Sequence, residues 1–163
     1  MTPSAYLARM LAVAVLASVG LVACEGHDTC GPSRGVVAKV IDGDTVELES
    51  GERVRYLMID TPETTSEIEC WGPEAKQYNI DRVLGKTIEL RYDQQCTDRY
   101  GRLLAFVEVD GENLNRTMIA EGYACVLHIS PNGDDVVSDY NAVENSARAV
   151  SAGLWGACDE NPC

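Results

Sequence analysis

The chain has 163 residues, of which 45% are hydrophobic and 24% are charged. This length allows one compact domain with a hydrophobic core and excludes a large multidomain enzyme. The 26 Asp and Glu residues outweigh 13 Lys and Arg residues, which gives a formal net charge of −13. Because such a charge repels polyanions, any contact with nucleic acid must be made by a local group of basic side chains.

The N-terminal segment is predicted to direct export. It contains a single charged residue, Arg9, followed by an apolar run over residues 10–22. The run is shorter than the roughly 20 residues that a transmembrane helix needs, so residues 1–23 are interpreted as a signal peptide. The sequence Leu-Val-Ala-Cys at residues 21–24 resembles a bacterial lipobox, which implies cleavage before Cys24 and lipidation of that cysteine. A plain secretory leader is the alternative.

The remaining chain divides into three parts. Residues 24–35 are polar and contain Gly and Pro, which favours a flexible tether. Residues 36–157 form the predicted domain, and residues 158–163 form a short tail that contains cysteines. Six of the seven cysteines remain when Cys24 is set aside, and an even number in an exported protein predicts disulfides. We therefore expect an exported protein that is attached to a membrane of the bacterial cell envelope, or is secreted.

The first half of the domain is predicted to be rich in strands. Residues 36–41 and 45–49 flank the turn Asp42-Gly43-Asp44, a pattern typical of a hairpin with one wet face. Residues 53–59 predict a third strand, which ends at Asp60-Thr61-Pro62-Glu63 because proline cannot continue it.

A helix is predicted next, over residues 73–84. Pro73 suits its first turn and Gly85 suits its end. The apolar spacing predicts four inward positions, Ala75, Tyr78, Ile80 and Val83.

The second half of the domain adds two strands and two helices. Residues 87–92 and 103–109 predict strands, Asn115 is a plausible N-cap for a short helix, and residues 138–152 predict the last helix. This order predicts an α+β fold, a five-stranded OB-fold barrel with three helices outside it.

Two acidic turns and two arginines suggest the chemistry. Asp42 and Asp44 share one turn, Asp60 and Glu63 share the other, and the arginines are Arg55 and Arg102. Carboxylates bind hard cations and guanidinium groups bind phosphate oxygens, so together they can support metal-assisted phosphodiester cleavage. Taken alone, the first turn is better explained as ordinary hairpin chemistry, and most arginines are solvated surface charges.

The pattern as a whole resembles the staphylococcal nuclease (thermonuclease) family. The matching blocks follow the family order over about residues 36–155. They are Val40-Ile41-Asp42-Gly43-Asp44-Thr45-Val46, Arg55, Asp60-Thr61-Pro62-Glu63-Thr64, Gly72-Pro73-Glu74-Ala75, Thr97-Asp98-Arg99-Tyr100-Gly101-Arg102, residues 115–122, and Gly153-Leu154-Trp155.

The resemblance implies an OB-fold and Ca²⁺-dependent hydrolysis of DNA and RNA. It places Asp44, Asp60 and the backbone carbonyl of Thr61 on the calcium ion, with Asp42 outside the direct ligand set. Glu63 would orient or deprotonate the attacking water.

The phosphate and substrate contacts are carried over in the same way. Arg55 and Arg102 would hold the phosphate and stabilise the charge that develops on it, while Arg99 and Tyr100 would contact the substrate. Where the family's best-known member offers tyrosines to the nucleotide, this chain has His128, which could stack or hydrogen-bond or could simply be a surface residue.

Within this fold, the first expectation for the cysteines is a bridge between Cys70 and Cys96 that braces two loops beside the site. The other four, Cys30, Cys125, Cys158 and Cys163, leave three pairings open. Zinc binding is a weaker alternative because no closely paired Cys or His spacing supports it.

Two other functions are compatible with the sequence. One is a non-catalytic OB-fold lipoprotein that binds oligonucleotides, and the other is a purely structural envelope lipoprotein. We expect a monomer whose partners are DNA and RNA substrates and a membrane reached through Cys24, with no protein partner implied.

Overall fold

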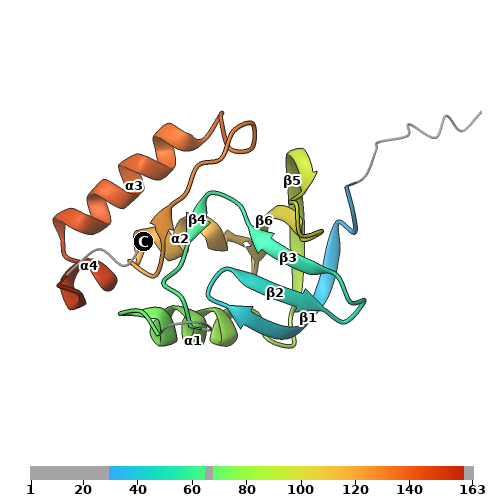
Figure 1. Cartoon of the computed structure of the whole chain (residues 1–163), viewed down its shortest axis with the longest axis horizontal. Coiled ribbons are helices and arrows are strands. Elements are labelled where there is room, and N and C mark those ends of the chain that lie inside the picture. The colour runs from blue at the N-terminus through green and yellow to red at the C-terminus, as the bar shows by residue number, and fades with distance from the viewer. Residues whose placement is uncertain (1–29, 65–67, 160–163) are drawn as a thin grey trace, which may run out of the picture.

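The computed structural model describes residues 30–64 and 68–159 (Figure 1). The predicted signal peptide over residues 1–23, the first half of the tether (residues 24–29, with the predicted lipidation site Cys24) and Cys163 lie outside the described residues. No helix within the described residues is both long and apolar enough to cross a membrane.

Five strands form a closed barrel, as predicted. Neighbouring strands pair in the order β3-β2-β1-β5-β6, and a further parallel pairing of β3 with β6 closes the cylinder. The other four pairings are antiparallel. The strands are β1 (Arg34–Asp42), β2 (Thr45–Leu48), β3 (Arg53–Tyr56), β5 (Thr87–Thr97) and β6 (Leu103–Val109).

Shorter elements surround the barrel. The strand β4 (Ile59–Asp60) pairs with β8 (Cys125–Val126), and β7 (Glu112–Asn113) pairs with β6. The three expected helices are present, together with a single-turn fourth helix that was not predicted. They are α1 (Gly72–Val83), α2 (Leu114–Ala120), α3 (Val137–Ala149) and α4 (Leu154–Ala157). Helix α1 packs against β1, while α2 packs against α3 and β6 (Figure 1).

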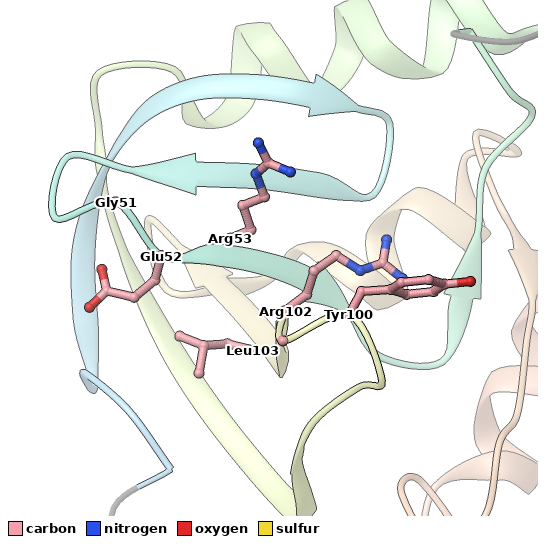
Figure 2. A pocket seen from close by; sticks show the side chains of 7 residues that line it. Gly51, Glu52, Arg53, Tyr100, Arg102 and Leu103 are labelled. Carbon is pink, nitrogen blue, oxygen red and sulfur yellow. The ribbon is translucent and has the colours of Figure 1, made fainter.

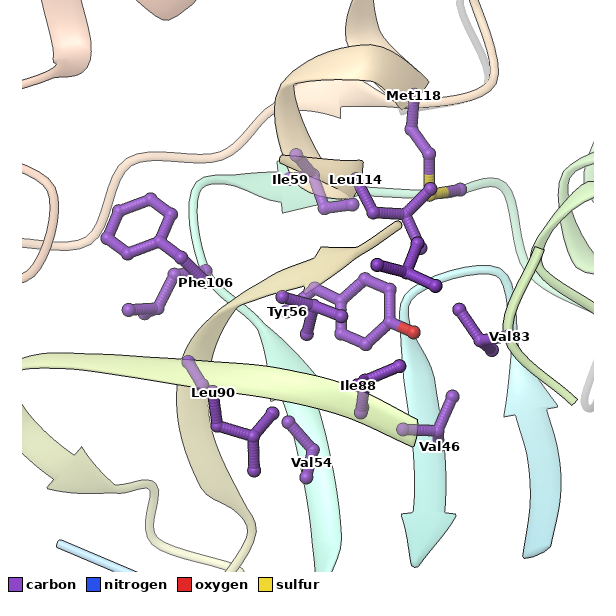
Figure 3. Close-up of a cluster of buried hydrophobic side chains, with 14 of the residues drawn as sticks. Val46, Val54, Tyr56, Ile59, Val83, Ile88, Leu90, Phe106, Leu114 and Met118 are labelled. Carbon is purple, nitrogen blue, oxygen red and sulfur yellow. The ribbon is translucent and has the colours of Figure 1, made fainter. Parts of the chain in front are cut away.

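The barrel interior and the inner faces of α1 and α2 make one hydrophobic core (Figure 3). Alternate residues of the strands point inward, so each strand contributes every second side chain. Tyr56, Phe106 and Met118 are among the largest buried side chains. Burying such side chains supplies the main driving force for folding, about 1.5 to 3 kcal/mol for each large aliphatic or aromatic group.

The predicted third strand is interrupted. Met58 adopts a φ of 66°, which ends β3 at Tyr56 and turns the chain into β4. The Arg55 side chain spans this bend, because its Nη1 donates to the carbonyls of Tyr56 and Ile59, each at 2.7 Å. The bend therefore depends on an arginine that the sequence marked for chemistry.

Asn115 does not cap α2, contrary to expectation. Asn113 is the N-cap and accepts a hydrogen bond from the Arg116 N–H at 2.9 Å. Asn115 is fully buried instead, where its side chain accepts from the Val107 N–H and donates to the Leu57 carbonyl. A buried polar side chain must find partners, and Asn115 finds them on the barrel wall.

The expected Cys70–Cys96 disulfide is wrong. Cys96 pairs with Cys30, and Cys70 pairs with Cys158; Cys125 is also disulfide-bonded. Cys96 lies near the end of β5, where the N-terminal segment runs beside the barrel, and Cys70 lies just before α1. Each cysteine is therefore closer to a terminal segment of the domain than to the other.

Candidate active site at the rim of the barrel

Arg55 on β3 is the centre of the acidic cluster. Its Nη2 donates to Asp60 Oδ1 at 2.7 Å, and its Nε lies 3.2 Å from Asp44 Oδ1. The Arg55 side chain is 12% exposed and that of Asp44 is 7% exposed, whereas 43% of the Asp60 side chain is open to solvent. One buried guanidinium thus joins carboxylates from both predicted acidic turns.

Asp44 also fixes the chain just after Asp60. Its Oδ2 accepts hydrogen bonds from the backbone N–H and the hydroxyl of Thr61, at 2.9 and 3.0 Å. Its Oδ1 accepts from the Thr45 hydroxyl at 3.0 Å. The Asp44 carboxylate therefore links the β1–β2 turn to the segment after β4.

Asp42 lies on the same turn and is held from two directions. Its Oδ1 accepts from the Gly43 N–H at 2.9 Å and from the Thr64 hydroxyl at 3.2 Å. Its carbonyl accepts from Nδ2 of Asn79 on α1, and Asn79 Oδ1 accepts from the Tyr56 hydroxyl. The buried Asn79 therefore ties the acidic turn to the barrel core.

Negative charge is crowded at this rim. Burial raises the pKa of Asp60 above 3.8, Arg55 lowers it, and the carboxylates of Asp44, Glu63 and Glu69 raise it again. Burial raises the pKa of Asp42 as well, opposed by the Gly43 hydrogen bond and reinforced by Asp44. Both shifts mean that ionisation of Asp42 and Asp60 is less favourable than in water, and that a cation bound beside them would favour it.

Glu63 lies at the exposed end of the cluster. Its backbone N–H donates to Glu69 Oε2 at 2.8 Å, and the Glu69 N–H donates to the Glu63 carbonyl at 3.0 Å. These bonds fix the backbone that carries the Glu63 side chain, which is exposed to solvent.

Arg102 is positioned by Asp98 in the loop between β5 and β6. Its Nε donates to Asp98 Oδ2 at 2.6 Å, and its backbone N–H donates to Asp98 Oδ1 at 3.0 Å. Asp98 Oδ1 also accepts from the Tyr100 N–H at 2.8 Å. Burial works against ionisation of Asp98, but the hydrogen bonds from Arg102 outweigh it and hold the pKa of Asp98 below its usual value.

One pocket brings the two arginines together. It has a volume of about 440 Å³, and Arg55, Arg102, Arg99 and Tyr100 all line it. The pocket therefore brings Arg55, which contacts Asp44 and Asp60, together with Arg102, Arg99 and Tyr100. The lining also includes apolar side chains, among them the exposed Leu127 and Ile129, together with Met58, Ile59 and Leu104.

His128 is not part of this pocket. Its neighbours Leu127 and Ile129 line the wall, but His128 Nε2 lies 2.8 Å from Asp134 Oδ1. The Ser130 hydroxyl donates to the same carboxylate. His128 is thus engaged in its own loop, and aliphatic side chains occupy the place where a stacking aromatic residue was considered.

The acidic residues suit a hard divalent cation by their chemistry. Asp44, Asp60 and the Thr61 carbonyl are oxygen donors of the kind that Ca²⁺ accepts in an irregular shell. Burial raises the pKa of Asp60 and the neighbouring carboxylates raise it further, so a cation beside Asp60 would favour its ionised form. Within residues 30–64 and 68–159, no group of three or more His, Cys, Asp or Glu residues is already arranged to hold a metal ion. These oxygen donors suit Ca²⁺, and in this structure Asp44 and Asp60 both contact the Arg55 guanidinium.

Sequence reasoning missed Asn79 as a contributor to this site. Tyr78 and Ile80 were expected to point inward, yet both are only partly buried and Asn79 is fully buried. The signal was available, because Ala75, Asn79 and Val83 are spaced by four residues and share one helix face. A polar residue on that face predicts a buried hydrogen-bonding partner.

Comparison with known proteins finds a matching family and several similar proteins. The model of the family described as "Staphylococcal nuclease homologue" matches residues 53–157. The chain is 32% identical to the SPbeta prophage-derived endonuclease YokF of Bacillus subtilis over 124 residues, which cover 72% of this chain and 42% of that protein.

Two further relatives extend the likeness. An uncharacterized endonuclease of Escherichia coli O157:H7 is 35% identical over 137 residues, which cover 82% of this chain and 84% of that protein. The thermonuclease of Staphylococcus intermedius is 34% identical over 103 residues, covering 60% and 61% of the two chains. The chain thus spans most of the length of the first and less than two thirds of the second.

Proposed function

The chain belongs to the staphylococcal nuclease homologue family, and from this premise we propose that it is a Ca²⁺-dependent nuclease that hydrolyses phosphodiester bonds of DNA and RNA. One observation carries the proposal. Arg55 binds both acidic turns and lines the same pocket as Arg102, so a phosphate in that pocket would meet both arginines and the acidic rim.

The arginines would bind and orient the phosphate. Arg102 keeps guanidinium N–H groups available because Asp98 engages it through Nε. Guanidinium groups match phosphate oxygens in geometry and stabilise the charge that grows on them as phosphorus becomes five-coordinate. Arg55 is anchored by Asp60 and by two backbone carbonyls, so its direction toward the pocket is fixed.

Glu63 would handle the attacking water. Its exposed carboxylate at the rim orients the water and accepts its proton as the new P–O bond forms. The bond from phosphorus to the departing 5′ oxygen then breaks, and Arg102 stabilises the charge on that oxygen. A bound Ca²⁺ ion on Asp44, Asp60 and the Thr61 carbonyl would supply Lewis-acid polarisation of the phosphate. Asp42 would lie outside the direct ligands of the ion and support them from there.

Activity is tested with the full chain produced in a bacterial host that exports it, so that the disulfides form. DNA and RNA are incubated with Ca²⁺, with Mg²⁺ and with excess chelator, and the Glu63→Gln variant is the matched control. We expect cleavage with Ca²⁺ that stops with chelator and is strongly reduced in Glu63→Gln. A folded protein that leaves both polymers intact with Ca²⁺ would overturn the proposal. Binding that ignores both Ca²⁺ and Glu63→Gln would instead support a non-catalytic binding module.

We further propose that the protein is exported, lipid-anchored through Cys24 and monomeric. The support is the apolar run at residues 10–22 followed by Leu-Val-Ala-Cys. Several acyl chains hold a protein stably on a membrane, whereas one does so only marginally. Mass spectrometry of the mature N-terminus should find a lipidated Cys24, and Cys24→Ser should move the protein to the soluble fraction. An unmodified mature N-terminus would exclude the anchor, and light scattering of the soluble variant checks the monomer.

A further inference from the structure

A second pocket adjoins the first on the other side of Tyr100. It has a volume of about 520 Å³ and is lined by the β2–β3 turn and by the loop that leads into β6 (Figure 2). Arg53, Arg102 and Tyr100 belong to its lining, and Arg102 and Tyr100 line the first pocket as well. The two pockets therefore share one arginine and one aromatic ring in their lining.

Strand register explains why three arginines gather here. Val54 on β3 pairs with Leu103 on β6, and both side chains are buried in the barrel. Successive residues of a strand point to opposite faces, so the residues that flank this pair point outward. Arg53 and Arg55 therefore stand on the same outer face of β3, and Arg102, immediately before Leu103, lies beside Arg53. The seam of the barrel carries a row of cations on an acidic protein.

Arg53 is available for a ligand. Its side chain is 62% exposed and forms an ion pair with Glu47 Oε2 at 3.2 Å, a neighbour across the β2–β3 pairing. An ion pair this exposed contributes little to stability, so a phosphate can compete with it. Glu52 also lines the pocket, but Figure 2 shows its carboxylate directed away from the guanidinium groups of Arg53 and Arg102.

Tyr100 separates the two pockets and offers an aromatic surface. It is 68% exposed, and the guanidinium carbons of Arg99 and Arg102 lie 4.7 and 5.5 Å from its ring centre. Exposed aromatic rings between phosphate-binding cations are typical of proteins that bind unpaired nucleic acid, because a splayed base can stack on the ring.

We propose that Arg53 forms a second phosphate-binding subsite. It holds the phosphodiester that follows, along one nucleic-acid strand, next to the one bound by Arg55 and Arg102. The ligand is an unpaired oligonucleotide that crosses Tyr100 and places one phosphate in each pocket. This inference rests on the proposed function and deepens it by defining which substrate the site takes.

The test measures binding by fluorescence anisotropy in the full chain carrying Glu63→Gln, with Ca²⁺ present, so that the probe is not cut. The probes are labelled oligothymidylates of two and six nucleotides. Arg53→Ala is compared with Arg34→Ala, another exposed arginine, which lines a different pocket with Glu89 and Glu108. Arg53→Lys keeps the positive charge.

We expect Arg53→Ala to weaken binding of the hexanucleotide about fivefold at low salt and to reduce the slope of log affinity against log salt by about 0.7. The dinucleotide, which has one phosphodiester, should bind with unchanged affinity. Arg34→Ala should leave both probes unaffected, and Arg53→Lys should retain the parent slope.

Equal hexanucleotide affinity and salt slope in Arg53→Ala and Arg34→Ala would overturn the subsite. If the chain with Glu63 intact still cleaved DNA with Ca²⁺, the proposed function would stand without the subsite. Both the subsite and the proposed function would be overturned if the folded chain with Glu63 intact cleaved no DNA and its Glu63→Gln variant bound neither probe.

Discussion

Arg55 and Asp60 are joined by a 2.7 Å hydrogen bond, and the same guanidinium lies 3.2 Å from Asp44. The arginine also holds the bend after β3 through the Tyr56 and Ile59 carbonyls. One side chain therefore has two tasks, because it shapes the backbone of the rim and neutralises part of the charge there. Both tasks use the planar fork of the guanidinium, which an ammonium group does not have.

Replacing Arg55 by Lys should damage both structure and activity. A lysine keeps the charge but loses most of the hydrogen bonds to the carbonyls and to Asp60, so we expect a loss of about 1 to 3 kcal/mol in unfolding free energy. Cleavage should fall by about 100-fold or more because the phosphate-binding geometry is lost. Urea unfolding and cleavage assays check this, with Arg34→Lys as the exposed control. Parent-like stability and cleavage in Arg55→Lys would contradict the role of the fork.

Replacing Glu63 by Gln should separate chemistry from folding. The side chain is exposed, so we expect the unfolding free energy to change by less than about 0.5 kcal/mol. Loss of the base should slow cleavage by about 100- to 10,000-fold at saturating substrate. Thermal melting and turnover measurements check this. A large stability change with unchanged turnover would assign Glu63 a structural task instead.

Replacing Asn79 by Ala should destabilise the protein strongly. The change leaves the buried Tyr56 hydroxyl and the Asp42 carbonyl without their partner, and each unpaired buried group costs about 1 to 3 kcal/mol. We expect a total loss of about 2 to 5 kcal/mol, measured by urea unfolding. Gln77→Ala on the exposed face of the same helix is the control, because the Gln77 side chain is exposed and donates to the exposed Asp81. Equal stability of the two variants would show that Asn79 does not brace the turn.

The Asp98–Arg102 pair should make a pH-dependent contribution to stability. The pKa of Asp98 in the folded protein lies below its ordinary 3.8, so the pair stabilises the fold above that value. The contribution is lost as the pH falls through the lowered folded value, since the protonated carboxyl cannot pair with Arg102. Urea unfolding of the parent and of Asp98→Asn should differ by about 1 to 2 kcal/mol at pH 6. This difference should shrink steadily below roughly pH 4.

Comparing the parent with Asp98→Asn separates the effect of Asp98 from the effects of other carboxylates, whose pKa values shift in the opposite direction. The pKa values of Asp42 and Asp60 are raised, so their ionisation costs stability at neutral pH and acid relieves that cost. These effects are common to the parent and the variant and cancel in the difference. A difference that stayed constant between pH 6 and pH 3 would contradict an ionised Asp98 as the source.

Removing the Cys30–Cys96 disulfide should lower stability by about 2 to 5 kcal/mol. The bridge closes a long loop and fixes the end of β5 next to the segment that carries Asp98 and Arg102. The Cys30→Ser, Cys96→Ser double variant should therefore lose activity at temperatures where the parent is still active. Melting and cleavage are measured together, and a melting temperature equal to that of the parent would contradict the expectation.

Local patterns predicted most of the elements. The strand over residues 103–109 has the predicted bounds, and α1 differs from its prediction by one residue at each end. The period of two along the strands and the Pro and Gly signals at the helix ends are local, so they survive without knowledge of the fold. The order of the elements then led to a closed barrel, which the pairing of β3 with β6 confirms.

The predictions are wrong where contacts between distant segments determine the local structure. The bend at Met58 depends on Arg55 reaching two carbonyls, and Asn115 is buried because Leu57 and Val107 need partners. Cys96 meets Cys30 because the N-terminal segment runs beside β5, where the Leu90 N–H donates to the Ser33 carbonyl. None of these contacts leaves a periodic signal in the chain. The acidic residues and arginines were predicted as a group, whereas the ion pairs within it required the three-dimensional structure.

The two disulfides of the described residues overlap along the chain. One joins residue 30 to residue 96 and the other joins residue 70 to residue 158, so their loops interlock in sequence. A protease that cuts the backbone once, anywhere between residues 30 and 158, would separate one member of a bridged pair from the other. The two fragments would remain one covalent molecule until a reductant is added, so a single backbone cut would not release either part of the domain.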